Sequence, residues 1–262
     1  MAKIFVCGST KGGVSKTTTT VNLAAACAEM GYKVLVVDFD PQGHSTKALN
    51  LDGSRLDHTL TDVMMPGKNG EKAPIEKVIY ETSIPNLHLA PSSLRLTLVN
   101  LALSGAVARE RFLAKELRKP AIMSRYDFVF IDTNPATDIL LINALAASDY
   151  LIACSKSEFS SLDGVEMMLD QMQMLKDSEI NTDIKLLGVM VSHRRKTAHD
   201  KKTLQSLKDR YNVLGCTAIR TEVNDAFEKG VPVVCDKPES DASKEYRRVA
   251  NELIRMYESD QL

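Results

Sequence analysis

The residues best suited to chemistry form a run rich in glycine, serine and lysine near the N-terminus. This run lies between an apolar stretch at residues 4–7 and a helical pattern over residues 17–30. A glycine-rich loop in that setting can turn its backbone N–H groups toward phosphate oxygens, and the helix adds the positive end of its dipole. We therefore predict that a nucleotide is bound by Lys11, Gly12, Gly13, Val14, Ser15, Lys16, Thr17 and Thr18.

The side chains of this loop have separate predicted roles. Lys16 is placed to reach the β- and γ-phosphates, and the Thr17 hydroxyl is the expected Mg²⁺ ligand. Thr18 is placed to bond the α-phosphate. The standard motif G-x-x-x-x-G-K-[ST] has glycine where this chain has Ser15. The loop therefore departs from the standard motif at one position, and it carries a second lysine, Lys11, at its start.

Two carboxylates follow apolar runs and indicate a metal site. Asp132 follows the run at residues 128–131, and Asp38 follows the run at residues 34–37. A carboxylate at the carboxyl edge of a parallel sheet can face Mg²⁺, usually through a water molecule. We predict Asp132 as such a water-mediated ligand and take Asp38 as a further candidate.

The spacing K-G-G-x-x-K-[ST], which begins at Lys11, resembles the deviant Walker A box of the ParA/MinD family of P-loop ATPases. The segment D-x-D-P-Q-G at residues 38–43 is similar to switch I of ParA-type proteins. The resemblance implies ATP and Mg²⁺, a homodimer formed on ATP, and a catalytic set of Lys11, Lys16 and Asp40. It implies that Lys11 contacts the phosphates of the partner subunit and that Asp40 positions the attacking water.

The resemblance extends over nearly the whole chain. Residues 132–135 read D-T-N-P, where the family usually has D-x-P-P, so the details of switch II are open. The pattern at residues 219–233, followed by Tyr246, looks like the C-terminal part of the family, which carries the adenine-side loop. This similarity implies that Arg220 lies near the base of the nucleotide.

Apolar runs alternate with helical patterns along the whole chain, without a linker or a repeat. This alternation is typical of an α/β fold with a mainly parallel, twisted sheet flanked by helices on both faces. We predict one P-loop NTPase domain over residues 1–262. Strands are expected at residues 4–7, 34–37, 87–90, 128–131, 150–154, 186–191 and 218–219. Helices are expected at residues 17–30, 139–147, 158–175, 201–211, 223–229 and 244–257, with one or two more within 94–117, broken near Ser104 and Gly105.

The composition limits the class of protein. The net charge is −1, so any contact with nucleic acid must come from a local patch. The five cysteines include no C-x-x-C pair and are expected to be core residues in a reducing cytosol. The N-terminus has no signal-peptide pattern, and the apolar stretch at residues 139–147 is far shorter than the roughly 18 residues that span a bilayer. We expect a cytoplasmic protein with no membrane partner.

The resemblance favours a DNA-partition ATPase of the ParA/Soj type, which serves plasmid or chromosome segregation. Proteins of this type dimerise on ATP and bind double-stranded DNA without sequence preference. They are released when a ParB-like, centromere-binding partner stimulates hydrolysis. The resemblance thus implies a slow, Mg²⁺-dependent ATPase switch that associates with the nucleoid.

Three other interpretations compete with this one. A MinD-like membrane- or cargo-positioning ATPase would need a basic amphipathic helix at the C-terminus, whereas residues 256–262 are acidic and polar. An iron–sulfur scaffold or reductase of the same fold would need paired cysteines. A small-molecule ATP-dependent synthetase or kinase also uses a P-loop, but it has no evident use for Lys11 and the D-P-Q-G segment.

Basic residues gather in the C-terminal third of the chain. A run of this kind is usually a solvated face, but the resemblance implies DNA contacts in this region. Lysine and arginine contacts to phosphates would make the affinity independent of sequence and sensitive to salt. The candidate DNA-binding residues are Arg194, Arg195, Lys196, Lys201, Lys202, Arg220 and Arg247.

Overall fold

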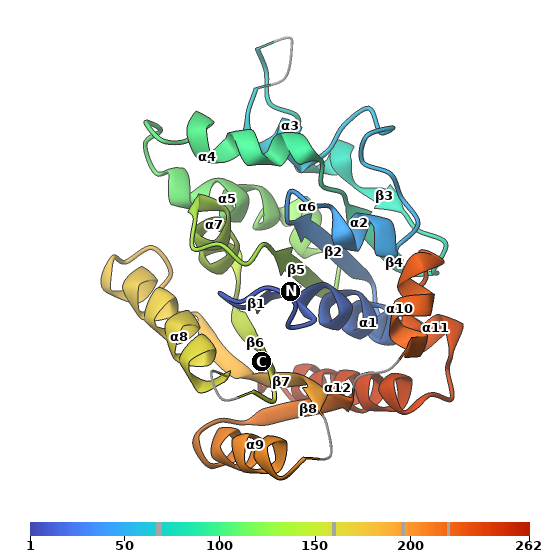
Figure 1. Cartoon of the computed structure of the whole chain (residues 1–262). Helices are drawn as coiled ribbons and strands as arrows, with labels where there is room; N and C mark the ends of the chain where they lie inside the picture. Colours follow the sequence, from blue (N-terminus) through green and yellow to red (C-terminus); the bar gives the residue numbers. More distant parts are fainter. Residues whose placement is uncertain (67–69, 159–160, 195–196, 219–220) are drawn as a thin grey trace.

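The structure, a computed structural model, describes residues 1–262 except 67–69, 159–160, 195–196 and 219–220 (Figure 1). Its strands form one sheet in the order β3-β4-β2-β5-β1-β6-β7-β8. All neighbouring strands are parallel except β3 and β4. The strands are β1 (Lys3–Gly8), β2 (Val34–Phe39), β3 (Tyr80–Glu81), β4 (Leu87–Ala90), β5 (Phe128–Thr133), β6 (Tyr150–Lys156), β7 (Lys185–Arg194) and β8 (Val213–Ala218).

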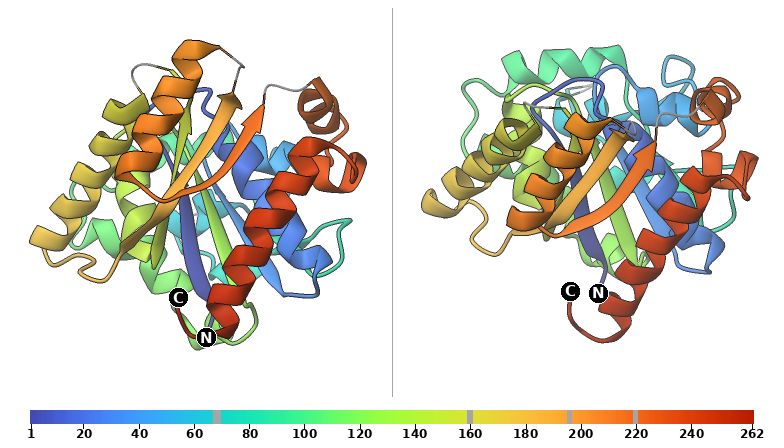
Figure 2. Two further views of the ribbon diagram at one scale, coloured as in Figure 1. Left: turned by 90° about the horizontal axis from the view of Figure 1, so that it is seen from below. Right: turned by 60° about the horizontal axis from the view of Figure 1, so that its bottom comes forward.

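Helices cover both faces of the twisted sheet (Figure 2). Side chains alternate along β1, so Ile4 and Val6 join one apolar cluster while Phe5 and Cys7 join the other. The first cluster is closed by α7 (Ile139–Ala147), α8 (Ser161–Asp177) and α9 (Ala198–Arg210). The second is closed by α1 (Lys16–Glu29) and α12 (Asp241–Glu258). The predicted α/β fold, with helices on both faces of a mainly parallel sheet, is confirmed.

The remaining helical segments are short. They are α2 (His44–Ala48), α3 (Leu60–Met64), η1 (Ile75–Val78), η2 (Leu94–Leu98), α4 (Val99–Ala102), η3 (Arg109–Arg111), α5 (Phe112–Leu117), α6 (Pro120–Met123), α10 (Thr221–Glu228) and α11 (Val233–Asp236). Four of them replace the one or two helices expected within residues 94–117. Ala108 has a φ of 53° there, and this left-handed conformation interrupts the helical path before η3.

The position of the last strand differs from the prediction. A strand was expected at residues 218–219, whereas β8 ends at residue 218, and small residues inside it weaken its apolar pattern. One of these, Gly215, allows close packing. A Cβ at this position would lie 2.8 Å from Val249 Cγ2 in α12 and 3.0 Å from Met190 Sδ in β7. Close packing against α12 therefore explains a glycine that a strand pattern disfavours.

The cysteines divide into two groups. Cys7, Cys27 and Cys154 are buried, which confirms their predicted place in the core, whereas Cys216 and Cys235 are half-buried. All five are free thiols. Within the described ranges, no helix combines the length and the apolar character that crossing a bilayer requires.

Candidate nucleotide and magnesium site

The order of the strands brings the phosphate loop and the acidic residues to one edge of the sheet. β5 lies between β1 and β2. Cys7 of β1 pairs with Asp132 of β5, and Asp132 pairs with Asp38 of β2. The loop that leaves β1 after Gly8 therefore begins beside both carboxylates, at the carboxyl ends of parallel strands, where α/β sheets bind their ligands.

The loop passes through two left-handed residues before α1 begins. Gly13 has a φ of 68° and Ser15 a φ of 64°. The second position is the one at which the standard motif has glycine, because this conformation costs a residue with a Cβ about 1–2 kcal/mol. Ser15 adopts it nevertheless, and its side chain does not cap α1. A helix N-terminus without a side-chain cap is suited to an anion, in agreement with the predicted phosphate site.

Asp132 is the centre of the candidate metal site. Its Oδ2 accepts hydrogen bonds from Thr17 Oγ1 and Ser45 Oγ, both at 2.8 Å. Its Oδ1 is buried and accepts no hydrogen bond from the residues that the structure describes. Burial raises the pKa of Asp132 to about 6, while the hydrogen bonds from Thr17 and Ser45 oppose this rise.

These residues fit magnesium. Mg²⁺ takes oxygen ligands and usually keeps several of its waters. A buried carboxylate oxygen without a partner is rare in proteins and calls for a ligand, a water or an ion. The Oδ1 of Asp132 is such an atom, and the Thr17 hydroxyl lies beside the same carboxylate. Thr17 and Asp132 would therefore hold Mg²⁺, with Asp132 acting through water as predicted.

Asp38 has a different environment from Asp132. Its Oδ2 accepts hydrogen bonds from Thr46 N at 2.7 Å and Thr46 Oγ1 at 2.6 Å, and Oδ1 accepts from Asp40 N at 3.4 Å. Burial, helped by the charge of Asp132, raises the pKa of Asp38 to about 8. Both oxygens of Asp38 are thus engaged, one by Thr46 of α2 and the other by the turn that leads into α2. The geometry favours a role in holding α2 over the metal contact that was predicted as a further possibility.

Asp40 opens the tight turn that leads into α2. Gly43 N donates to Asp40 O at 2.9 Å, and Gln42 N donates to Asp40 Oδ1 at 2.9 Å. Gly43 has a φ of 63°, which explains why the D-P-Q-G turn ends in glycine. The turn holds the Asp40 carboxylate just past the carboxyl end of β2, where a base could orient a water molecule toward a phosphate.

The other loop residues are anchored from several sides. Lys16 is buried, and its Nζ donates to Lys11 O at 3.3 Å. The Val14 carbonyl accepts from Ser192 Oγ at 3.1 Å. Gly12 faces open space, since a Cβ there would meet nothing within 4 Å. The loop is therefore held from beneath, while its outer side remains accessible to a nucleotide.

Comparison with known proteins decides the family. The family described as an AAA domain matches residues 2–186. The sporulation initiation inhibitor protein Soj of Bacillus subtilis is 30% identical over 257 residues, which are 97% of this chain and 98% of that protein. The chromosome partitioning protein ParA of Caulobacter vibrioides is 27% identical over 256 residues, 96% of this chain and 94% of that protein. The chain belongs to the ParA/MinD family of P-loop ATPases.

Two solved structures of similar proteins agree with this assignment. One is cobyrinic acid a,c-diamide synthase from Mycobacterium smegmatis with bound ADP and magnesium, with a TM-score of 0.82, 27% identity and coverage of 99% of this chain and 97% of that chain. The other is the septum site-determining protein MinD from Pyrococcus horikoshii with Mg-ADP, with a TM-score of 0.79, 25% identity and coverage of 97% and 96%. The P-loop fold predicted for this ParA/MinD family member is confirmed.

The first lysine of the ParA/MinD loop, Lys11, lies along the start of α8. A Cβ at Gly164 would lie 3.5 Å from Lys11 Cδ and 3.6 Å from Cε. Gly164 therefore leaves room for the aliphatic part of this lysine beside the helix. The contact of Lys11 with a partner's phosphates, which the family resemblance implies, stays a prediction.

Switch II carries an asparagine at a position where the ParA/MinD family usually has proline. Asn134 Nδ2 donates to Asp138 Oδ2 at 3.0 Å. Asp138 Oδ1 in turn accepts from the backbone N–H groups of Leu140 and Leu141 and so caps α7. The asparagine thus ties switch II to the first turn of α7. Sequence reasoning missed Asp138, although a carboxylate directly before a helical pattern is a typical capping signal.

Ser45 and Thr46 are two further residues that sequence reasoning missed. They lie side by side in α2, and one donates to Asp132 while the other donates to Asp38. Their hydroxyls therefore connect switch I to both buried carboxylates. The only signal in the sequence was their position directly after the D-P-Q-G turn, and that position does not show which atoms they contact.

The basic residues predicted to contact DNA do not form one patch. Lys201 and Lys202 are exposed on α9, which covers one face of the sheet. Arg247 lies on α12, on the opposite face, where it donates to Glu29 at 3.0 Å and to two backbone carbonyls. Arg247 therefore lies apart from the lysines of α9, and its contact with DNA stays a prediction. The remaining candidates are Arg194, at the end of β7, and Arg195, Lys196 and Arg220, which lie outside the described residues.

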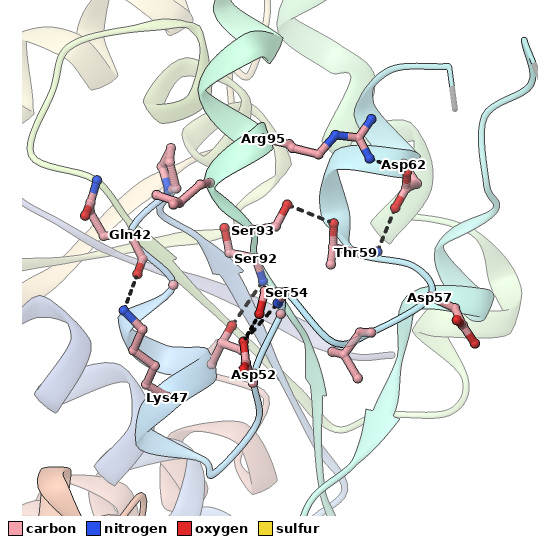
Figure 3. A pocket seen from close by; sticks show the side chains of 16 residues that line it. Gln42, Lys47, Asp52, Ser54, Asp57, Thr59, Asp62, Ser92, Ser93 and Arg95 are labelled. Atoms are coloured by element: carbon pink, nitrogen blue, oxygen red, sulfur yellow. Dashed lines mark hydrogen bonds and ion pairs between the residues drawn. The ribbon is translucent and has the colours of Figure 1, made fainter. Parts of the chain in front are cut away.

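A cavity of about 780 Å³ lies beside switch I (Figure 3). Pro41, Gln42 and Gly43 line it, and no residue of the phosphate loop does. The wall also contains Thr46 and the buried Ser92, whose backbone N–H donates to Thr46 Oγ1 at 3.0 Å. Because the same hydroxyl donates to Asp38, one hydrogen-bonded path runs from the cavity wall to the acidic pair beneath the nucleotide site.

Proposed function

We propose that this chain is a DNA-partition ATPase that serves plasmid or chromosome segregation. It dimerises on ATP, binds double-stranded DNA without sequence preference, and is released when a ParB-like, centromere-binding partner stimulates hydrolysis. The observation that carries the proposal is the two-lysine loop of Lys11 and Lys16 beside the turn that holds Asp40. Its similarity to the chromosome partitioning protein of Caulobacter vibrioides supports the same assignment.

ATP is the proposed substrate and Mg²⁺ the proposed cofactor, which the ADP and magnesium of the similar Mycobacterium smegmatis structure support. Lys16 binds the β- and γ-phosphates, and Thr18 binds the α-phosphate. Thr17 and Asp132 hold Mg²⁺, which when bound neutralises charge on the phosphates. Asp40 orients a water molecule toward the terminal phosphate. Hydrolysis is slow in the protein alone, because a switch must persist until its partner arrives.

The dimer places two copies face to face over two nucleotides. Each Lys11 contacts the phosphates in the other subunit, so the dimer depends on ATP. Lys201 and Lys202, exposed on α9, contribute phosphate contacts together with the basic residues 194–196 that precede this helix. Two copies of a weak basic surface in one dimer bind DNA much more tightly than one copy does, which makes DNA binding depend on ATP. The protein then acts in the cytoplasm, on the nucleoid.

The similarity to MinD of Pyrococcus horikoshii keeps a membrane-positioning ATPase as the second candidate. A helix that binds a membrane surface needs an accessible apolar face. In α12 that face is packed in the core, since Tyr246, Val249 and Leu253 are all buried against the sheet. A MinD-like function would therefore need a membrane-binding element other than α12. The similarity to a cobyrinic acid a,c-diamide synthase keeps a small-molecule synthetase as a third candidate.

Binding to random-sequence duplex DNA tests the proposal. We would measure it with ATP, ADP and no nucleotide at several salt concentrations, for the wild type and for Asp40→Ala. The expected result is binding that requires ATP, weakens steeply with salt and persists in Asp40→Ala, because this variant cannot leave the ATP state. Lys201→Gln should weaken it, whereas Lys185→Gln, which removes an exposed lysine at the amino end of β7, should not.

An absence of DNA binding in a protein that still binds ATP would contradict the partition function. Binding to anionic lipid vesicles in the presence of ATP would then support the membrane-positioning candidate. If neither DNA nor vesicles bind, turnover with small-molecule carboxylates would test the synthetase.

A further inference from the structure

A third lysine lies at the phosphate loop. Lys156 is the last residue of β6, and β6 pairs with β1 so that Ala153 lies opposite Gly8. Because the two strands are parallel, β6 ends at the same level as the loop that leaves β1. A Cβ at Gly13 would lie only 3.6 Å from Lys156 Nζ. The ammonium group of Lys156 therefore lies directly beside the glycine turn of the loop.

The neighbouring carboxylate holds this lysine only loosely. Lys156 Nζ is 4.0 Å from Glu158 Oε1, at the outer limit of an ion pair. The Glu158 side chain is 64% exposed, whereas that of Lys156 is 27% exposed. An exposed ion pair at such a distance contributes little to stability, because water screens both charges. The ion pair with Glu158 would therefore cost little to break.

The three lysines reach the loop from different directions. The Lys16 amine is folded onto the Lys11 carbonyl, the Lys11 side chain lies along Gly164 of α8, and Lys156 comes from β6. Thr18 and α1 lie on the side of the predicted α-phosphate, so the turn at residues 11–13 lies toward the terminal phosphate. The end of β6 thus brings an additional positive charge to the end of the nucleotide at which ATP differs from ADP.

We propose that Lys156 is a third phosphate-binding lysine, which leaves Glu158 and contacts the terminal phosphate when ATP binds. Lys156 thereby increases the preference of the site for ATP over ADP, and Glu158 competes with the phosphate for it. The inference rests on the ATP site of the proposed function and is independent of DNA binding. A chain that binds no DNA but requires Lys156 for ATP selectivity would contradict the partition function and leave this inference standing.

Nucleotide affinities test the role of Lys156. We would measure the binding of a fluorescent non-hydrolysable ATP analogue and of the matching ADP derivative, both with Mg²⁺. Lys156→Gln should weaken the binding of the ATP analogue by about tenfold, the usual effect of losing one hydrogen bond to a charged group. Its affinity for ADP should change by no more than about twofold, because ADP lacks the phosphate concerned. Lys156→Arg should retain most of the ATP affinity.

Two matched variants complete the experiment. Glu158→Gln should leave the affinity for the ATP analogue unchanged or raise it, because the competing carboxylate is removed. Lys185→Gln removes a lysine from the opposite edge of the sheet and should alter neither affinity. Thermal unfolding without nucleotide checks that Lys156→Gln is folded. If Lys156→Gln is not folded, the nucleotide affinities of Lys156→Arg and Glu158→Gln are compared instead.

Two results would overturn the proposal. Wild-type affinity of Lys156→Gln for both nucleotides would mean that Lys156 does not contact the bound nucleotide. An equal loss of ATP and ADP affinity would mean that it positions the loop at Gly13 and does not contact the terminal phosphate. A loss of ATP affinity in Glu158→Gln as large as that in Lys156→Gln would rule out that Lys156 leaves Glu158 to contact the terminal phosphate.

Discussion

Replacing Asp132 by asparagine should alter the pH dependence of stability in the nucleotide-free protein and greatly reduce the stabilisation by Mg²⁺ and ATP. The wild-type carboxylate is fully buried and has an unpartnered oxygen among the described residues. It is therefore poorly solvated when charged, and burial accordingly raises its pKa. Asparagine keeps the size and one acceptor oxygen of the side chain but carries no charge at any pH.

The magnitude follows from the shift in pKa. The pKa of Asp132 rises from 3.8 to about 6 on folding, and one pKa unit corresponds to about 1.4 kcal/mol. The contribution of a group with a raised pKa is fully present below the unfolded value and is lost as the pH rises through the folded value. Wild type should therefore lose about 3 kcal/mol relative to Asp132→Asn between pH 3 and pH 8. Roughly half of this loss falls between pH 5 and pH 7.5.

Urea unfolding in the presence of a chelator measures this difference at pH 5 and at pH 7.5. The buried amide of Asp132→Asn affects stability equally at both pH values. We therefore compare how the difference in the free energy of unfolding between the two proteins changes from pH 5 to pH 7.5. Removal of the Asp132 charge also eases the ionisation of Asp38, which acts in the same direction. A difference between the two proteins that is independent of pH, or that favours wild type at the higher pH, would refute the reasoning.

The same unfolding experiment with added Mg²⁺ and ATP tests whether Asp132 takes part in the magnesium site. A ligand at one hundred times its dissociation constant stabilises a folded protein by about 2.7 kcal/mol. Mg²⁺ with ATP should give wild type an increase of this order and Asp132→Asn a much smaller one. Equal stabilisation of the two proteins would show that Asp132 does not take part in the magnesium site.

Three further changes have expected outcomes. Thr46→Val removes the hydroxyl that donates to Asp38, and urea unfolding should show a loss of about 1–3 kcal/mol; an unchanged midpoint would contradict the role of this contact. Gly188→Ala should lower the stability by about 1–3 kcal/mol, because a Cβ there would lie 2.5 Å from a backbone carbonyl, whereas Gly105→Ala, with nothing within 4 Å, serves as the neutral control. Lys11→Ala should still bind ATP but fail to dimerise on it in light-scattering measurements, and normal dimerisation would exclude the contact between subunits.

Local sequence patterns were sufficient for the phosphate loop. Its spacing, and its place between an apolar run and a helical pattern, are properties of neighbouring residues. The same holds for Asp132, the proposed metal ligand, which is the polar residue directly after an apolar run. In the sequence, Ser15 is only a departure from the standard motif. The structure shows that Ser15 adopts the left-handed backbone conformation, which is strained for a residue with a Cβ.

Predictions that depended on distance in space were less successful. Arg247 was grouped with Lys201 and Lys202 because all belong to a basic part of the sequence, yet the sheet separates α12 from α9. In the segment at residues 94–117 the predicted break near Ser104 and Gly105 is confirmed, because a turn follows α4 there. The further division before η3 was not predicted, because the left-handed residue Ala108 leaves no mark in the apolar pattern. The last strand was predicted at residues 218–219, although β8 begins at Val213. Gly215 interrupts the apolar pattern of β8, and only its packing against α12 explains why a glycine lies there.

The sequence by itself determined the chemical class of this protein, because the order of loop, strand and helix around a phosphate site is a local pattern. Only the tertiary structure decided which carboxylate takes which role. Asp132 and Asp38 both end apolar strands, but Asp132 has an oxygen with no partner in the described part of the chain, whereas Asp38 accepts two hydrogen bonds from Thr46. Such differences, like the approach of Lys156 to Gly13, arise between segments far apart in the chain that meet only when the strands are ordered into a sheet.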